Sequence, residues 1–257
     1  MKPARLLAIA CLALPVGCAW QRMHSSEASH WRQARQLVLV TTADWNTDRG
    51  LLRHYDRTSH GWRQVGDAQP VMLGRSGSAW GLGLQDAGHA GPVKREGDGR
   101  SPAGVFAIGE AFGYAPTANT SLPYAPMQAS NYCVDVSGSP LYNRIVDADV
   151  VGAAAVAQAT EPMRRDLHAH GDQRYRLGFV IRHNIQASPM AGSCIFAHLW
   201  KSPDDPTTGC TAMAPAAMDA VLGWLQPARN PVFVLLPLAE YAHLRSSWDL
   251  PALDAAD

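Results

Sequence analysis

The segment Gly192-Ser-Cys-Ile-Phe-Ala-His198 is followed, after a loop that contains Pro203 and Pro206, by Thr207-Thr-Gly-Cys-Thr-Ala-Met213. The first segment is an apolar run that ends in a histidine, and the second places a thiol directly after a glycine. The polar residues and the two prolines between them interrupt any strand, so we expect the chain to loop out and return. Such a return would bring together a cysteine and a histidine that are twelve positions apart in the sequence.

Cys210 and His198 are a candidate nucleophile and general base. A thiol attacks a carbonyl only as the thiolate, so a catalytic cysteine needs a proton acceptor close by. Gly209 has no side chain, and we expect the backbone around Gly209 and Thr208 to approach a substrate oxyanion, with Thr208 orienting the turn. One cysteine and one histidine also fit a buried thiol and a hydrogen-bonded imidazole without catalysis.

The composition indicates a globular protein and gives no reason to expect binding to nucleic acid. The chain has 257 residues, 47% of them hydrophobic and 17% charged, with a formal net charge of zero. A neutral chain without basic runs lacks the electrostatic attraction that nucleic acids and anionic membranes exert on basic proteins. No phosphate-binding glycine loop and no short metal-binding spacing is present, so we expect neither a cofactor nor a metal.

The first twenty residues have the pattern of a secretory signal. Two charged residues, Lys2 and Arg5, precede an apolar run from Leu6 to Val16. This run is too short to span a bilayer as a helix but suits the core of a signal peptide. Cleavage after the small residues 17–19 would export the protein to the periplasm or cell envelope, and a lipoprotein signal with a lipid anchor at Cys18 stays open as the alternative.

The cysteine count leaves one candidate disulfide. Five cysteines lie at positions 11, 18, 133, 194 and 210, and the first two belong to the signal region. Three cysteines in an oxidising compartment imply either one disulfide with one free thiol or three free thiols. If a disulfide forms, the pair Cys133–Cys194 is the one that leaves Cys210 free.

Short β-branched runs between turn residues predict a mainly β fold, that is, a β-rich α+β protein. Met218, Val221, Leu222 and Leu225 recur at helical spacing after Pro215, which predicts a short helix that covers the sheet. A further short helix is expected around residues 161–167. The predicted strands are 36–42 and 51–55 as a hairpin, then 62–65, 70–73, 105–108, 177–184, 193–199 and 231–236.

Further substrate-binding candidates follow from the strand pattern. Alternation places Cys194, Phe196 and His198 on one face of the strand 193–199. The preceding predicted strand, 177–184, ends in Arg182, His183 and Asn184, which would adjoin His198 if the two strands pair. An exposed strand end is the plainer interpretation of these three residues. In the long loops before them, Tyr142 and Asn143 are candidates to line the cleft, where packing is the alternative for the tyrosine.

The order of these motifs resembles that of the YkuD-type L,D-transpeptidases, cysteine enzymes that crosslink or trim bacterial peptidoglycan. The residues that carry the resemblance are the turn and strand Asp98-Gly-Arg-Ser-Pro-Ala-Gly-Val-Phe-Ala-Ile108, the strand that ends in His198, the Thr208-Gly209-Cys210 core, and the closing helix and strand. The resemblance implies a YkuD-like β-sandwich or mixed sheet with its short covering helix near the C-terminus. It covers the catalytic domain (36–238), so the chain is expected to consist of a signal peptide (1–20), a polar linker (21–35), this L,D-transpeptidase-like domain and a C-terminal tail (239–257).

The resemblance also implies a substrate and a reaction. In the family, the cysteine attacks a stem tetrapeptide of peptidoglycan before its terminal D-alanine, and an amine of a second stem resolves the thioester. Carried over, Cys210 is the nucleophile, His198 the general base and the backbone of Gly209 and Cys210 the oxyanion hole, and the partners are peptidoglycan stem peptides. This chain departs from better-known members, which have Ser-His-Gly-Cys, an Arg or Asn where Ala212 stands, and a Gly where Leu199 follows the histidine.

Three alternatives to transpeptidation remain. The first is an L,D-carboxypeptidase or amidase that hydrolyses the same bond with water in place of the amine. The second is a zinc hydrolase, because Cys194, His198, Cys210 and His183 are residue types that bind zinc. The third is a non-catalytic module that binds the envelope and retains only the fold.

Overall fold

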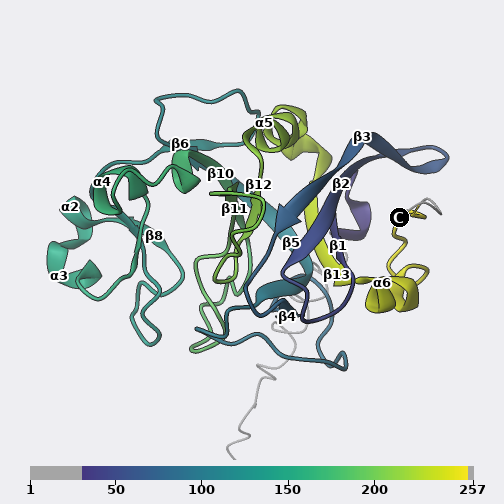
Figure 1. Ribbon diagram of the computed structural model, residues 1–257, viewed down its shortest axis with the longest axis horizontal. Helices are drawn as coiled ribbons and strands as arrows, with labels where there is room; N and C mark the ends of the chain where they lie inside the picture. The colour runs from purple at the N-terminus through teal and green to yellow at the C-terminus, as the bar shows by residue number, and fades with distance from the viewer. Residues whose placement is uncertain (1–30, 254–257) are drawn as a thin grey trace, which may run out of the picture.

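The protein, represented by a computed structural model that describes residues 31–253, consists of a barrel-like sheet with a smaller unit beside it (Figure 1). The predicted signal peptide and most of the predicted linker 21–35 lie outside the described residues. Strands dominate and helices are few and short, which confirms the mainly β fold class.

Eight strands form a closed ring, because β5 pairs with β13 on one side and with β10 on the other. The ring runs β10-β11-β12-β3-β2-β1-β13-β5 and contains both parallel and antiparallel neighbours, so the predicted mixed sheet is confirmed. Closure leaves these eight strands without the exposed edges that an open sheet presents. The strands of the ring are β1 (Gln36–Thr42), β2 (Arg49–Thr58), β3 (Gly61–Met72), β5 (Ser101–Gly113), β10 (Leu177–Ile181), β11 (Phe196–Leu199), β12 (Thr211–Met213) and β13 (Val232–Pro237).

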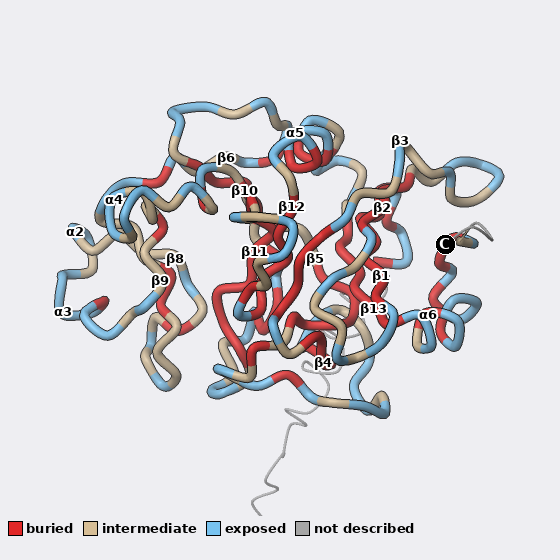
Figure 2. The backbone as a smooth tube through the Cα atoms, in the orientation of Figure 1, coloured by how far each residue is buried: buried red, intermediate tan, exposed pale blue. Residues whose placement is uncertain are grey.

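The predicted hairpin is present as β1 and β2, which pair in antiparallel fashion. On its other edge β1 pairs in parallel with β13, and both strands are buried along their whole length, which explains why they are continuous apolar runs rather than alternating ones. The runs predicted at 62–65 and 70–73 belong to one strand, β3, whose pairing with β2 is interrupted by a register shift at Leu52–His54 and then resumes. Figure 2 shows the central strands of the barrel, β1 and β13 among them, mostly in the colour of buried residues.

β5 closes the ring because it is long enough to pair with two strands in succession. Its segment 104–107 pairs with β13, and its segment 108–113 pairs with β10. Gly104 has φ +132°, and a Cβ there would lie 2.4 Å from the Gln85 side chain, so glycine allows the strand to pass this point. Two short strands, β4 (Ser78–Trp80) and β6 (Tyr124–Pro126), pair in parallel with the two ends of β5.

Residues 127–176, here called the small unit, lie beside β10 and β11 (Figure 1). Its three-stranded sheet has the order β8-β7-β9, and a disulfide between Cys133 of β7 and Cys194 ties it to the segment before β11. The helix predicted around 161–167 begins later, at Arg165, because Glu161 and Pro162 pair with β7. The elements of the small unit are β7 (Asn131–Cys133), β8 (Ile145–Asp147), α2 (Ala148–Val151), α3 (Ala153–Val156), β9 (Glu161–Pro162), α4 (Arg165–His168) and η2 (Arg174–Arg176).

The predicted covering helix is α5 (Pro215–Trp224), which packs on the sheet through Met218, Val221 and Leu222. Pro215 occupies its first turn, where the fixed φ of proline suits a helix and no N–H is needed. The remaining helical segments are η1 (Trp31–Gln33), η3 (Pro227–Arg229) and α6 (Leu238–Leu244).

The boundaries predicted for the linker and the tail are wrong. α6 lies within the predicted tail, and Tyr241, Leu244 and Trp248 are buried in the main core. At the other end, Trp31 of the predicted linker is also buried and meets Trp248 edge to face, with ring centroids 5.6 Å apart. Apolar burial therefore makes both segments part of the folded unit, at least from residue 31 to residue 253.

Two apolar clusters divide the interior, and β11 contributes to both. Ala197 and Leu199 point into the main core of the barrel. Phe196 points to the other side, into a second cluster with Cys210, Met127 and Met163 that lies between the sheet and the small unit. His198 shares the face of Phe196 because side chains alternate along a strand. The candidate site therefore lies under the small unit.

Candidate active site under the small unit

Cys210 and His198 lie on the same face of two neighbouring parallel strands. His198 of β11 is opposite Ala212 of β12, so Cys210, two residues before Ala212, is beside Phe196. The offset of two residues corresponds to roughly 7 Å along the strands, which is within reach of an aromatic side chain. Within residues 31–253, no hydrogen bond joins the His198 ring to the Cys210 sulfur. The predicted pair thus shares one site without direct contact in this state.

The His198 ring has one nitrogen in use and one available. Nδ1 lies 2.8 Å from the backbone oxygen of Leu199, and because a carbonyl only accepts, Nδ1 carries the proton. Burial lowers the pKa of His198 to about 4, so the ring is neutral at pH 7 and Nε2 carries a lone pair. The Leu199 carbonyl therefore fixes the tautomer that a general base requires.

The Cys210 thiol is enclosed and protonated. Sγ accepts from the Phe196 N–H at 3.3 Å and donates to the Cys194 carbonyl at 3.4 Å. Burial raises the pKa of Cys210 to about 12, and only 7% of the residue is exposed. The resting site therefore holds a neutral thiol and a neutral imidazole rather than a thiolate–imidazolium pair.

Tyr175 and Glu161 complete the surroundings of the thiol, and sequence reasoning missed both. The Tyr175 ring meets the His198 ring edge to face, with centroids 5.1 Å apart. Its hydroxyl interacts with the Glu161 carboxylate and with the Cys210 sulfur, and burial raises the pKa of Tyr175 well above its usual value. Burial also raises the pKa of Glu161, which pairs with Arg165 at 3.0 Å. No motif surrounds these residues in the sequence.

The turn before Cys210 is held by Thr207 and not, as predicted, by Thr208. Thr207 Oγ1 donates to the Cys210 carbonyl at 2.6 Å and accepts the Gly209 N–H at 3.1 Å. The Gly209 N–H is therefore occupied, which contradicts its predicted role as an oxyanion donor. Thr208 is exposed. The predicted need for glycine itself fits, since a Cβ on Gly209 would lie 3.1 Å from the Arg100 carbonyl.

The segment Asp98-Gly-Arg-Ser-Pro-Ala-Gly packs directly on this turn. Ser101 Oγ donates to the Cys210 carbonyl at 3.1 Å and accepts the Gly74 N–H at 2.9 Å. Asp98 accepts from Lys94 Nζ at 2.6 Å and from the Arg100 N–H at 2.9 Å. In the sequence alone this motif indicates only a turn before a strand. In the structure it positions the backbone of Cys210.

The prediction that Arg182, His183 and Asn184 adjoin His198 is wrong. β10 and β11 do pair, but in antiparallel fashion, so His198 is opposite Gly178 at the start of β10. Residues 182–184 follow the end of β10, beyond Val180, which is opposite Phe196. They lie at the far end of the strand pair from His198 because the direction of pairing, which the alternation pattern does not encode, is reversed.

His183 and Asn184 are buried structural residues. His183 accepts the Leu82 N–H at Nδ1 and contacts the Ala191 carbonyl through Nε2 at 2.9 Å, and burial lowers the pKa of His183 to about 4. Asn184 donates from Nδ2 to the carbonyls of Ser188 and Gly192. These side chains brace the loop before β11 and are not available to a ligand.

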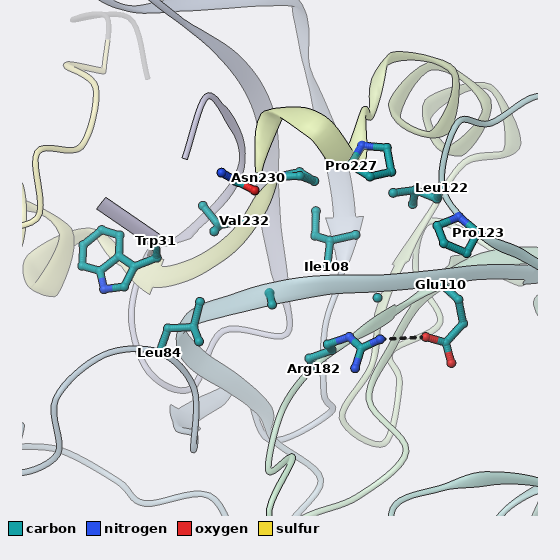
Figure 3. A pocket seen from close by; sticks show the side chains of 13 residues that line it. Trp31, Leu84, Ile108, Glu110, Leu122, Pro123, Arg182, Pro227, Asn230 and Val232 are labelled. Carbon is teal, nitrogen blue, oxygen red and sulfur yellow. Dashed lines mark hydrogen bonds and ion pairs between the residues drawn. The ribbon is translucent and has the colours of Figure 1, made fainter. Parts of the chain in front are cut away.

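Arg182 and Tyr142 lie elsewhere as well. Arg182 pairs with Glu110 at 3.2 Å beside a groove that Trp31, Leu84 and Ile108 line, as Figure 3 shows. Tyr142 is 1% exposed and its hydroxyl donates to Glu96, so it cannot line an open cleft. Asn143 Nδ2 donates to the carbonyls of residues 183 and 184, and its Oδ1 accepts the Cys194 N–H at 2.8 Å.

The disulfide fixes the roles of the cysteines and removes one zinc donor. Cys133 is bonded to Cys194, and Cys210 is the free cysteine of the described residues, which confirms the pairing considered from the sequence. Cys194 and His183 are committed to structural bonds, so the four donors considered for zinc are not assembled. Residues 31–253 hold no group of three or more His, Cys, Asp or Glu placed to bind a metal.

Comparisons of the chain with protein-family models, with curated proteins and with solved structures give no match. Within the described part of the chain, no helix has the length and apolar character needed to cross a membrane.

Proposed function

We propose that the protein is a peptidoglycan-modifying cysteine acyltransferase of the L,D-transpeptidase type, exported to the periplasm or cell envelope. The observation that carries the proposal is the His198 ring, whose Nδ1 is bound to a backbone carbonyl while Nε2 keeps its lone pair on the face that holds the free thiol of Cys210. The closed mixed sheet with α5 packed on it is assigned, within the same proposal, to a YkuD-like architecture.

The first half-reaction forms a thioester. The Cys210 S–H proton passes to His198 Nε2 as the sulfur attacks the carbonyl carbon that precedes the terminal D-alanine of a stem tetrapeptide. The S–C bond forms, the C–N bond to D-alanine breaks, and the imidazolium returns its proton to the leaving amine. Since both groups are neutral at rest, proton transfer accompanies attack rather than preceding it.

The second half-reaction restores the thiol. An amine of a second stem peptide attacks the thioester carbonyl, His198 takes a proton from that amine, and as the S–C bond breaks the imidazolium returns the proton to the Cys210 sulfur. Water in place of the amine gives the hydrolytic alternative. The backbone N–H of Cys210 is the proposed oxyanion donor, since the Gly209 N–H is bound to Thr207 and the Cys210 carbonyl is held by Ser101 and Thr207.

Access to the sulfur requires movement of the small unit. Met127, Met163 and Cys133 pack in the same cluster as Cys210, and the sulfur is enclosed. A peptide carbonyl reaches Sγ only when side chains of this unit move aside. The proposal therefore assigns to the small unit the role of a cover that excludes water from the thioester.

The test is covalent capture of the acyl-enzyme. The purified protein, incubated with a tetrapeptide donor or a carbapenem, is expected to gain the mass of one acyl group at Cys210, measured by intact mass and peptide mapping. The Cys210→Ser variant is the matched control and should gain none within the same time. Product analysis with purified muropeptides separates transfer from hydrolysis. Absence of an adduct on the folded wild-type protein would overturn the proposal in favour of a non-catalytic binding module.

A further inference from the structure

A cavity next to the candidate site lies between the small unit and the end of β11. It has a volume of about 640 Å³. Its walls come from α4 and the following turn, from η2, and from Leu199, Trp200 and Lys201 directly after His198. Arg174 and Arg176 of η2 flank Tyr175, whose ring contacts the His198 ring. The cavity therefore adjoins the catalytic base although it does not contain it.

The cavity is strongly cationic. Four of its lining residues are arginine or lysine and a single one, Asp172, is acidic. Asp172 pairs with Arg165 at 2.9 Å and with Arg174 at 2.6 Å. Burial alone would raise the pKa of Asp172, but hydrogen bonds from these two arginines outweigh it and hold the pKa well below its usual range. The positive lining residues are Arg165, Arg174, Arg176 and Lys201.

Two of these cations have no counter-ion in the part of the chain that the structure describes. Arg165 is compensated by Glu161 and Asp172, and Arg174 by Asp172. Arg176 and Lys201 are exposed, and within residues 31–253 neither side chain makes an ion pair or a hydrogen bond. A concave site with uncompensated positive charge concentrates anions, and a guanidinium fork binds a carboxylate through two parallel hydrogen bonds.

The remaining wall is apolar. Leu199, Trp200 and Pro215 also line the cavity. A ligand that fits both walls carries a carboxylate beside an aliphatic or peptide portion. A small inorganic anion would satisfy the charges but would leave the apolar wall and most of the volume empty.

We propose that this cavity binds the carboxylate of an anionic peptide, with Arg176 and Lys201 as its charge partners. The inference rests on the proposed function in one respect, since it takes the peptide to be the stem peptide that Cys210 attacks. Binding at this place would hold one end of the peptide beside His198 while the small unit contacts the rest.

The experiment separates binding from catalysis by use of the Cys210→Ala variant, which cannot form a thioester. Its affinity for a stem tetrapeptide with a free C-terminal carboxylate is compared, by calorimetry, with its affinity for the same peptide amidated at the C-terminus. We expect amidation to weaken binding about tenfold or more, because a charge-assisted pair is lost. In the background with Arg176→Ala and Lys201→Ala, amidation should change the affinity less than about twofold.

Arg182→Ala supplies the matched control, since Arg182 is an exposed arginine that pairs with Glu110 outside the cavity. It should retain the full preference for the free carboxylate. Equal binding of the acid and the amide, no binding of either, displacement of the peptide by phosphate alone at low concentration, or an equal loss in Arg182→Ala would each overturn the inference. Adduct formation on wild-type protein is measured separately, so a failed cavity and a failed acyltransferase give different results.

Discussion

Two buried polar clusters meet at residues 193 and 194, and they differ in what their side chains leave unbound. The nucleophile cluster consists of Cys210, His198, Tyr175 and Glu161. The bracing cluster consists of Lys94, Glu96, Asp98, Tyr142 and His183.

Each cluster has a histidine with a pKa near 4 and a tyrosine beside a glutamate. In His183 both ring nitrogens are hydrogen-bonded, whereas in His198 a bond is recorded, among the described residues, at Nδ1 alone. Burial and pKa are therefore poor guides to catalysis here. The distinguishing feature is a ring nitrogen with a free lone pair on the same face of the sheet as a free thiol.

Separate replacement of the two histidines tests the difference between the clusters most directly. His198→Gln removes the proposed base, so acylation of Cys210 should slow by about 10³-fold, while the folded state is kept. His183→Gln should cost about 1–3 kcal/mol of stability through its lost hydrogen bonds, with acylation per folded molecule unchanged. Rates come from intact mass over time and stability from urea unfolding. Similar acylation rates in the two variants would remove the basis for assigning His198 as the base.

His183 and His198 should contribute equally to the dependence of the free energy of unfolding on pH. Both have a pKa of about 4 in the folded protein, below the ordinary value of 6.5, because burial disfavours the charged ring. Between these values the unfolded chain binds protons that the folded protein does not, so stability is full above pH 6.5 and falls as the pH decreases towards 4. Each histidine should account for roughly 3 kcal/mol of this loss.

Urea unfolding at pH 7 and at pH 4.5 measures this loss, and His183→Gln or His198→Gln should each reduce the difference by similar amounts. The comparison between variants isolates each histidine from carboxylates that titrate in the same range. A variant that leaves the pH slope unchanged would show that its histidine is not held neutral in the folded protein.

The sequence predicts the positions of some residues in these two clusters and not of others. The placement of Cys210 and His198 on one face could be predicted, because residue chemistry, the proline-broken loop and strand alternation all act over a short stretch. Tyr175 and Glu161 were missed because they come from the small unit, far along the chain from Cys210, and reach the thiol only through the tertiary packing of that unit. His183 was misassigned because alternation gives the face of a strand but not the direction of its partner.

The fold shows the same division. The hairpin of β1 and β2 and the helix α5 were predicted from local pattern, since their apolar spacing and turn residues lie within each element. Closure of the ring was not, because it depends on one long strand, β5, pairing with both β13 and β10. The pairing of β5 with both strands depends on the packing of distant segments, which the residue pattern of a single strand does not reveal.

The two tyrosines offer a finer test of the comparison. Tyr175→Phe removes a hydroxyl beside the sulfur, where it can donate as negative charge develops, so acylation should slow about tenfold. Tyr142→Phe removes the bond to Glu96 and should cost about 1–2 kcal/mol of stability without slowing acylation. The same mass and unfolding measurements serve here. Unchanged acylation in Tyr175→Phe would reduce Tyr175 to a packing residue.

The smallest expected effect on acylation concerns the turn before Cys210, which Thr207 and Ser101 hold in place. Thr207→Val removes the hydroxyl that bonds the Cys210 carbonyl and the Gly209 N–H, so we expect a loss of about 1–3 kcal/mol of stability. Thr208→Val changes an exposed side chain and should alter stability by less than about 0.5 kcal/mol. If the hydroxyl also sets the orientation of the Cys210 backbone, acylation should slow a few-fold in Thr207→Val alone. Equal losses of stability and of acylation rate in Thr207→Val and Thr208→Val would support the role first predicted for Thr208. They would also show that the Thr207 hydrogen bonds do not set the reactivity of the Cys210 thiol.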